Sequence, residues 1–195
     1  ANKFQILDFN NIEIVNKSYD DIYSNHLHKI DDELTINLKG YSNKENQKLS
    51  KIVDEIRSIN QNMIIYTKSP TATQNKANEI IKYSIKLNKG ISQELNELII
   101  HLKNRFQFTD WSVINGLENK IAIHHGLIPK YIQKEIVKLF NNGDIDILIS
   151  TTTITEGVNT SAKNLIVTSS RKGRKPLKTF DAKNISGRAG RFLYH

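Results

Sequence analysis

The segment ILISTTTITEGVNTSAKNLIV, residues 147–167, carries the strongest structural signal in the chain. An apolar run at Ile145–Ile149 leads into a row of hydroxyl-bearing residues, and a second apolar run follows at Asn164–Thr168. Short apolar, β-branched runs are typical of strands that are buried on both faces of a parallel sheet. The hydroxyls between them therefore follow a predicted buried strand, at a position suited to phosphate contacts.

Strands and helices alternate on the N-terminal side of this segment. Apolar runs predict further strands at Met63–Thr67 and Ile121–His124, and an alternating patch at Glu33–Leu38 predicts another. Helical spacing of apolar residues predicts helices at Asn43–Ile59, Thr71–Leu87, Ser92–Phe106 and from Pro129 through Phe140. In the second of these helices, Ile85 is among the residues expected to face inward. An N-cap at Asp181 predicts a last helix through Gly187. This order predicts an α/β fold, a parallel sheet with helices on both faces.

Polar segments follow each of the predicted inner strands. In an open parallel sheet, the loops at the carboxyl ends of the strands lie along one edge and form the active site. We therefore expect convergence of Thr67–Thr71, His124–Pro129, Ser150–Thr155 and Ser169–Pro176.

The length of 195 residues favours one domain with an appendage. Residues 1–45 are polar and irregular, and we expect an N-terminal appendage or an edge of the same domain there. Residues 46–195 form the predicted main domain, with a helical excursion at about 88–118. Neither residues 1–45 nor the excursion has a predicted function.

Composition narrows the possible classes of protein. The absence of cysteine excludes disulfides and thiolate metal sites. The net charge of +8 favours a polyanionic partner, although a lysine-rich proteome explains the charge equally well. Without a signal peptide or an apolar run of membrane-spanning length, the sequence predicts a cytoplasmic protein with no membrane partner.

Two arginines flank small residues in Ser186–Arg191, which reads SGRAGR. Arg188 and Arg191 are three residues apart, so on a helical turn they project from one face and can clamp a transferring phosphoryl group. The alternative is a solvated basic helix end. Gly187 and Gly190 are costly in a helix of that kind, which favours the phosphate clamp.

The other polar clusters are more ambiguous. The hydroxyls of Ser150–Thr155 suit phosphate contacts, but a serine–threonine turn capping a helix is an equally good interpretation. His124 and His125 have no acidic or histidine partner at metal-ligand spacing, so no metal site is predicted. We expect His124 to hydrogen-bond to backbone at the strand end, and His125 is the better candidate for a structural hydrogen bond near the site. The basic segment Arg171–Pro176 is a solvated loop or a contact for a nucleic-acid backbone.

Four segments together resemble the second RecA-like domain of a superfamily-two helicase of the DExH type. MIIYTKS at Met63–Ser69 resembles the block that opens this domain, and HHGLIPKYIQKEIVKLF at His124–Phe140 resembles its HHG-plus-helix block. ISTTTITEGVN at Ile149–Asn159 resembles the fifth helicase motif, and SGRAGR resembles the sixth, which carries arginine fingers. The resemblance covers residues 60–191 and implies a RecA-like (P-loop NTPase-type) fold.

The resemblance also implies roles for individual residues. Arg188 and Arg191 would be catalytic, approaching the γ-phosphate of ATP. The nucleotide side would include Gly157, Asn159, Asn184 and Gly187, and the nucleic-acid side would include Thr151, Thr152, Ser69 and His125. Two positions depart from the pattern, because Asn184 stands where the family has Gln and Glu156 is acidic where the family has a small or basic residue.

The sequence contains neither a GxxxxGK[ST] phosphate loop nor an acidic metal box. In the family both belong to the first RecA-like domain, where they hold ATP and Mg²⁺. The prediction is therefore one half of a motor from a longer protein, inactive alone, that acts on DNA or RNA as a single strand. The alternatives are a non-enzymatic nucleic-acid-binding or regulatory module with a RecA-like fold, and a duplex translocase of the same superfamily.

Overall fold

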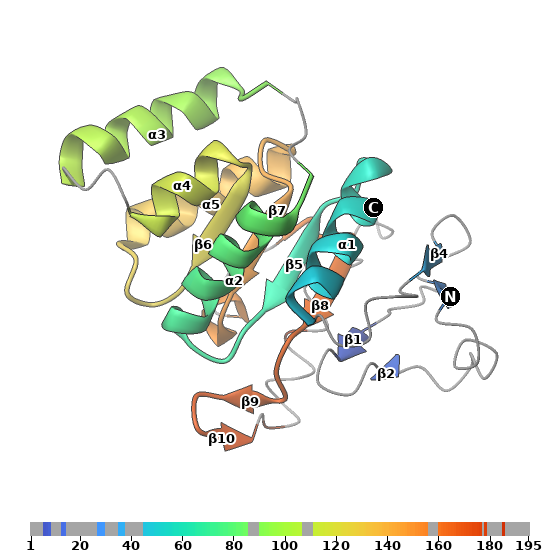
Figure 1. Ribbon diagram of the computed structural model, residues 1–195. Coiled ribbons are helices and arrows are strands. Elements are labelled where there is room, and N and C mark those ends of the chain that lie inside the picture. Colours follow the sequence, from blue (N-terminus) through green and yellow to red (C-terminus); the bar gives the residue numbers. More distant parts are fainter. Residues whose placement is uncertain are drawn as a thin grey trace, which may run out of the picture.

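The computed structural model describes residues 6–8, 13–14, 27–29, 35–37, 45–85, 90–106, 111–155, 160–176, 178 and 185. A six-stranded sheet forms its centre (Figure 1), in the order β2 (Glu13–Ile14), β1 (Ile6–Asp8), β8 (Asn164–Val167), β5 (Met63–Tyr66), β7 (Ile147–Ser150) and β6 (Ile121–His124). Four of these strands have both faces covered and are called the inner strands below: β5, β7, β8 and β6, the last of which stands at one edge of the sheet. The pairs β1–β8, β8–β5, β5–β7 and β7–β6 are all parallel. This arrangement confirms the predicted α/β, RecA-like class.

The inner strands are built on apolar runs, with polar residues only at their ends, because both of their faces are covered. Every residue of β5, β6 and β7 is buried, and none of them is more than 1% exposed. Burial on both faces removes any reason for polar and apolar residues to alternate. The continuous apolar runs of the sequence therefore match strands that are covered on both faces.

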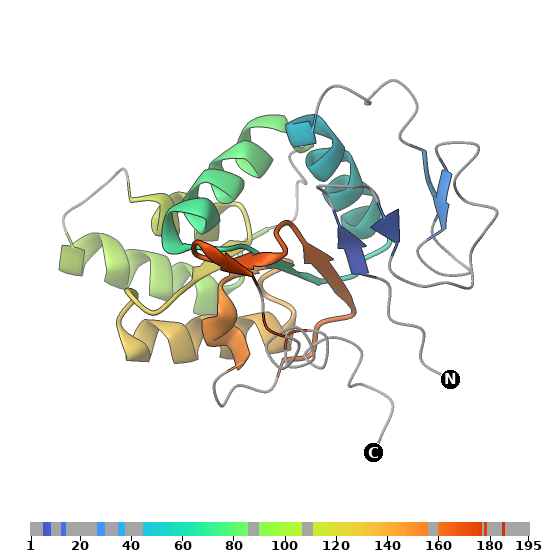
Figure 2. The ribbon, with the colours of Figure 1, turned by 90° about the horizontal axis from the view of Figure 1, so that it is seen from below.

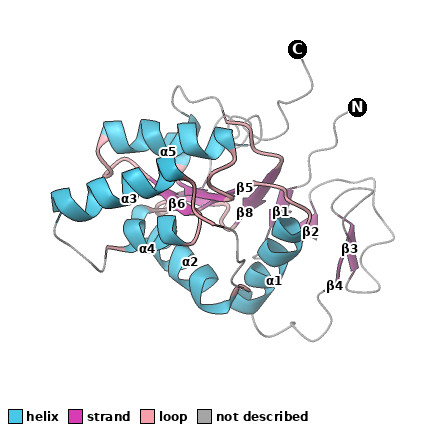
Figure 3. Ribbon diagram, turned by 90° about the horizontal axis from the view of Figure 1, so that it is seen from above, coloured by secondary structure: helices cyan, strands magenta, loops and turns pink. Residues whose placement is uncertain are grey.

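Helices cover the two faces of the sheet (Figures 2 and 3). On one face lie α1 (Glu45–Ser58), α2 (Pro70–Tyr83) and α4 (Ser112–Glu118), and on the other lies α5 (Lys130–Asn142). The remaining helix, α3 (Gln93–Phe106), packs on α4 and reaches α5 through an edge-to-face contact between His101 and Tyr131. None of the helices in the described residues is both long and apolar enough to cross a membrane.

The segment predicted as a helical excursion contains a helix that the periodicity did not indicate. Within α4, Val113, Ile114 and Leu117 are fully buried, and they join the same hydrophobic core as the central strands. Gly116 lies so close to β6 that an added Cβ would stand 2.5 Å from the carbonyl oxygen of Ile121. At seven residues, α4 is too short to give a clear periodic pattern, and its burial comes from tertiary packing.

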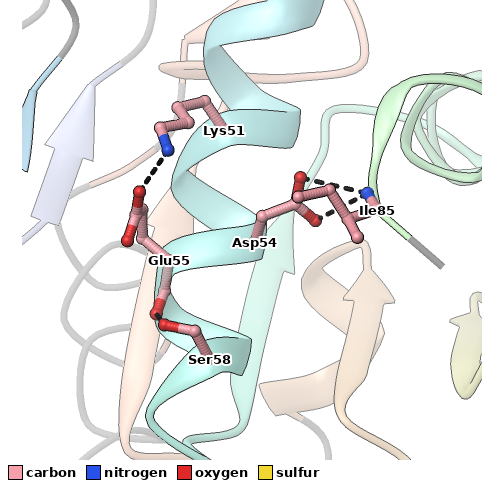
Figure 4. A network of polar contacts seen from close by, with 5 residues as sticks. All are labelled: Lys51, Asp54, Glu55, Ser58 and Ile85. Carbon is pink, nitrogen blue, oxygen red and sulfur yellow. Dashed lines mark hydrogen bonds and ion pairs between the residues drawn. The ribbon is translucent and has the colours of Figure 1, made fainter. Parts of the chain in front are cut away.

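The end of α2 corrects the predicted helix Thr71–Leu87. The helix ends at Tyr83, and Ile85, which was expected to face inward, is 68% exposed. Both carboxylate oxygens of Asp54 accept a hydrogen bond from the backbone N–H of Ile85 at 3.1 Å, so α1 holds the chain as it leaves α2 (Figure 4). Partial burial raises the pKa of Asp54, although this hydrogen bond acts to lower it.

The N-terminal residues contribute to two sheets. Strand β1 (Ile6–Asp8) pairs parallel with β8, and β2 (Glu13–Ile14) pairs antiparallel with β1 at the edge of the main sheet. Strand β4 (Thr35–Asn37) falls within the strand predicted at Glu33–Leu38 and pairs with β3 (Leu27–Lys29) in a separate small sheet. The boundary predicted near residue 45 stays a prediction.

A buried ion pair fastens three elements at the amino edge of the sheet. The guanidinium of Arg57, at the end of α1, lies 3.0 Å from the carboxylate of Asp146, directly before β7. It also donates to the backbone carbonyl of Asn119, after α4, at 3.4 Å. The Arg57 side chain is only 7% exposed, so both charges are largely removed from water and depend on each other.

Candidate functional site

The loops after the inner strands meet at the carboxyl edge of the sheet, as predicted. The backbone N–H of Thr67 donates to the carbonyl of Ser150 at 2.8 Å, which joins the ends of β5 and β7. The N–H of Thr168 donates to the carbonyl of Tyr66 at 3.1 Å, and that of Thr151 to the carbonyl of His124 at 3.3 Å. These bonds continue the sheet by one residue beyond each strand and hold the loops side by side.

Ser69 is the N-cap of α2. Its side-chain oxygen accepts from the backbone N–H of Ala72 at 3.3 Å, and its carbonyl accepts from Thr73 at 3.1 Å. Pro70 follows at the first helical position, where its missing N–H costs nothing. The sequence TKSP therefore forms a rigid strand-to-helix turn, and the contact between Ser69 and nucleic acid stays a prediction.

The threonine row after β7 forms a single 3₁₀ turn, η2 (Thr152–Thr155). Thr151 and Thr152 are 9% and 8% exposed, and Thr153 is half-buried. The hydroxyls of Thr151 and Thr153 lie 3.2 Å apart, and the carbonyl of Thr151 accepts from the N–H of Ile154 at 3.2 Å. The turn folds these hydroxyls toward one another and against the end of β6.

His124, the last residue of β6, faces the threonine row. Its Nδ1 lies 3.3 Å from the hydroxyl of Ser150 and 3.3 Å from that of Thr153, while its Nε2 is buried and has no hydrogen-bond partner in the described part of the chain. Burial lowers the pKa of His124 to about 4, so the ring is neutral at physiological pH. An uncharged imidazole therefore lies where the end of β6 meets the turn after β7, a contact between His124 and Ser150–Thr153 that we call the loop junction.

His125 is directed into the loop that follows it. Its Nδ1 accepts from the backbone N–H of Leu127 at 3.3 Å, and the side chain is 4% exposed. The buried amide of Gln133, on α5, donates to the carbonyls of His125 and Ile128 at 3.2 and 2.6 Å. Burial lowers the pKa of His125 as well. These contacts fit the predicted structural hydrogen bond, and the contact with nucleic acid stays a prediction.

The basic segment after β8 forms a hairpin. The sequence had predicted either a solvated loop or a contact for a nucleic-acid backbone there. Strands β9 (Arg171–Lys172) and β10 (Lys175–Pro176) pair antiparallel, and Gly173 adopts φ +60° in the turn between them. The Gly173 N–H donates to the carbonyl of Lys68 at 2.7 Å, and the hydroxyl of Tyr66 donates to the carbonyl of Arg171 at 3.0 Å. The hairpin is therefore held at the end of β5 (Figure 1). Its cationic side chains are exposed.

The predicted nucleotide residues lie outside the described part of the chain. These are Gly157, Asn159, Asn184, Gly187, Arg188 and Arg191. Of the predicted last helix, only Ile185 is described, and it is helical and 2% exposed. Among the described residues, no group of histidine and acidic side chains is arranged to hold a metal ion.

Two residues of the loop junction received no specific role from the sequence. Thr153 was one hydroxyl in a row, and His124 was expected to bond to backbone at the strand end. What distinguishes them is their contact with each other, which joins the turn after β7 to the end of β6. Spacing along the chain carries no signal for a contact between residues 29 positions apart.

The parallel sheet with its loops gathered at the carboxyl edge defines a RecA-like α/β domain. The family described as Helicase conserved C-terminal domain matches residues 85–193, more than half of the chain. The chain belongs to this family, which confirms the resemblance to the C-terminal RecA-like domain of superfamily-two helicases.

Curated relatives support the same family. Anti-bacteriophage protein B of Escherichia coli K12 is 38% identical over 132 residues, 68% of this chain and 17% of that protein. ATP-dependent DNA helicase Hel308 of Aeropyrum pernix is 32% identical over 75 residues, 36% of this chain and 10% of that protein. The mitochondrial ATP-dependent RNA helicase SUV3 of Candida albicans is 24% identical over 124 residues, 60% of this chain and 17% of that protein. This chain thus spans about a sixth or less of the length of these relatives.

Proposed function

We propose that this chain is the C-terminal motor domain of an ATP-dependent helicase or translocase of the DExH type. In this proposal, the carboxyl edge of the sheet contacts the phosphate backbone of a single DNA or RNA strand. The observation that carries the proposal is the convergence of hydroxyl-bearing loops and a cationic hairpin at that edge. Hydroxyls and cations bind phosphate without reading bases, so binding would be independent of sequence.

The same proposal assigns ATP to a first RecA-like domain elsewhere in the native protein. That domain would supply the phosphate loop and hold Mg²⁺, neither of which this sequence provides for. Arg188 and Arg191 would approach the γ-phosphate when the two domains close, and they would stabilise the charge that develops there. Gly157, Asn159, Asn184 and Gly187 would line the nucleotide side. Opening and closing would shift the contacts along the strand.

The test is the ATPase activity of the native protein that contains this domain, with and without single-stranded DNA or RNA. Arg188→Ala and Arg191→Ala should each lower stimulated activity by about 10³-fold, the lower end for an arginine finger. Arg105→Ala is the matched control, because Arg105 is an exposed arginine on α3. Full activity in both finger variants would exclude the motor role.

The alternative function is a nucleic-acid-binding or regulatory module without ATPase activity. The same experiment separates the two, because a module would bind the strand without hydrolysing ATP. Stimulation by duplex rather than by single strands would indicate a duplex translocase. The relatives include a protein named as a DNA helicase and one named as an RNA helicase, so both polymers belong in the assay.

A further inference from the structure

A chain of hydrogen-bonding groups runs beneath the carboxyl edge, from His124 to Thr151. His124 Nδ1 lies 3.3 Å from the hydroxyl of Thr153, and that hydroxyl lies 3.2 Å from the hydroxyl of Thr151. His124 is 1% exposed, Thr153 is half-buried and Thr151 is 9% exposed, so both threonines are more exposed than the histidine. Each hydroxyl has one hydrogen to donate, so the direction of one bond fixes the direction of the next.

Ser150 sets the direction of this chain. Its hydroxyl donates its single hydrogen to the carbonyl of Thr151 at 2.9 Å. The same oxygen lies 3.3 Å from His124 Nδ1 and is left to accept there, which favours the tautomer of the neutral ring that has its proton on Nδ1. The other nitrogen, Nε2, is buried and has no partner among the described residues, which is where the unprotonated nitrogen belongs.

With the proton on Nδ1, this one N–H is shared between the oxygens of Ser150 and Thr153, each at 3.3 Å. The hydroxyl of Thr153 then accepts from His124 and donates to Thr151. The hydrogen of Thr151 is then not used inside the chain and remains available to a ligand. With the proton on Nε2 instead, Thr153 would donate to Nδ1 and Thr151 to Thr153. Thr151 would then present only lone pairs, which repel an anion.

We propose that His124 is a positioning residue, whose Nδ1–H orients the hydroxyls of Thr153 and Thr151 so that Thr151 offers a hydrogen-bond donor to a nucleic-acid phosphate. This inference rests on the proposed function, which places a phosphate at Thr151. Burial supports it, because the lowered pKa of His124 keeps the ring neutral and a single tautomer can persist. Thr153 becomes the link between the histidine and the phosphate.

Matched variants separate the hydrogen bonds from the packing. His124→Asn keeps an amide donor near the position of Nδ1, whereas His124→Leu has a similar shape and no donor. Thr153→Ser keeps the hydroxyl, whereas Thr153→Val removes it at nearly constant volume. Thr151→Val removes the final donor. The measurement is the affinity of the native protein for single-stranded DNA and RNA over a series of salt concentrations, with folding checked by thermal melting.

Thr151→Val, Thr153→Val and His124→Leu should each weaken binding about tenfold, the worth of one hydrogen bond to a charged group. Thr153→Ser and His124→Asn should stay within about threefold of the unaltered protein. The double variant of His124→Leu and Thr153→Val should bind no more weakly than either single variant, because both break the same chain. The dependence on salt should not change, since no charge is removed.

The results of these binding experiments distinguish a failure of the proposed role of His124 from a failure of the proposed nucleic-acid contact. Weakening by Thr151→Val alone would overturn the role of His124 and leave the phosphate contact standing. A changed salt dependence in His124→Leu would show that the loops have moved and would also overturn it. No effect of Thr151→Val would remove the contact and the inference with it, and no binding of either polymer would overturn the proposed function itself.

The tautomer of His124 gives a second measurement that needs no variant. A long-range proton–nitrogen correlation spectrum of the native protein, labelled with ¹⁵N at histidine and recorded near neutral pH, distinguishes a proton on Nδ1 from one on Nε2. We expect Nδ1–H. A proton on Nε2 would reverse the chain and overturn the inference even if every variant failed to fold.

Discussion

At the scale of single residues, burial of His124 makes the stability of the domain depend on pH. Its pKa is about 4 in the folded chain and 6.5 when unfolded, so between these values the unfolded state binds more protons. The contribution of the neutral ring is therefore complete above pH 6.5 and is lost as the pH falls toward 4. Its full size is roughly 3 kcal/mol.

The prediction is that the free-energy advantage of the unaltered chain over His124→Asn shrinks as the pH falls from 7 to 4.5. Denaturant unfolding of both proteins at each pH measures it. Burial also lowers the pKa of His125 in the same direction, but His125 is present in both proteins and cancels in the difference. An advantage that stays constant with pH would show that His124 does not titrate on unfolding.

Gly116 offers a test of packing at a single atom. Gly116→Ala should destabilise the chain by about 1–3 kcal/mol, because the new Cβ would meet the backbone carbonyl of Ile121, which cannot rotate away. Gly90→Ala is the matched control, since a Cβ there would meet no heavy atom of the described residues within 4 Å. Thermal or denaturant unfolding measures both, and equal stability of the two variants would contradict the close approach of α4 to β6.

Residue types along the chain predicted the contents of the loop junction but not its connections. The threonine row and the histidine pair stand out in the sequence because they follow buried strands. The direction of the hydrogen bonds between His124 and Thr151 depends on the hydroxyl hydrogen of Ser150. That hydrogen is donated to the carbonyl of Thr151 only in the folded protein. A sequence pattern reports which groups are present and cannot report which donor has been used.

At the scale of elements, continuous apolar runs predicted the inner strands to within one or two residues. A run of this kind fits few structures other than a buried strand, because the side chains on both faces must be largely apolar. The elements that the sequence did not define are those that tertiary contacts impose. Helix α4 is short and held by the core, and the end of α2 is fixed by Asp54 from another helix. The β9–β10 hairpin has no apolar pattern and depends on its anchor at Lys68.

The hairpin should contribute charge to nucleic-acid binding. Replacing Arg174 and Lys175 by Gln removes two exposed cations, and the slope of log affinity against log salt should fall by about 0.7–0.9 for each phosphate that the protein no longer neutralises. The measurement is binding of the native protein to a single strand over a salt series. Lys138→Gln is the control, because Lys138 is an exposed lysine near the end of α5. That end of the helix leads into β7 and therefore lies at the opposite edge of the sheet from the hairpin. An unchanged slope in the double variant would place the polyanion elsewhere.

At the scale of the whole molecule, the proposed function makes this chain one side of a two-sided site. Its hydroxyl-bearing loops and its hairpin follow strand ends at one edge, and its sequence has no phosphate loop to hold ATP. We expect these 195 residues alone to show no ATPase activity above the buffer rate, with or without a nucleic acid, while the native protein shows stimulated activity. A phosphate-release assay on both proteins checks this. Activity of the isolated chain would mean that it holds ATP by itself.

The order of strands in the sheet also constrains how the protein is made. Strand β5 lies between β7 and β8, and its partners Ile147–Ser150 and Asn164–Val167 are synthesised roughly 85 to 100 residues after it. Closing loops of this length costs entropy before any pairing is gained, so these contacts form late. Until the ribosome has released β7, the apolar Met63–Tyr66 has neither neighbour, and it lacks the second one until β8 follows. During that time the nascent chain depends on its helices to keep this strand from other partners.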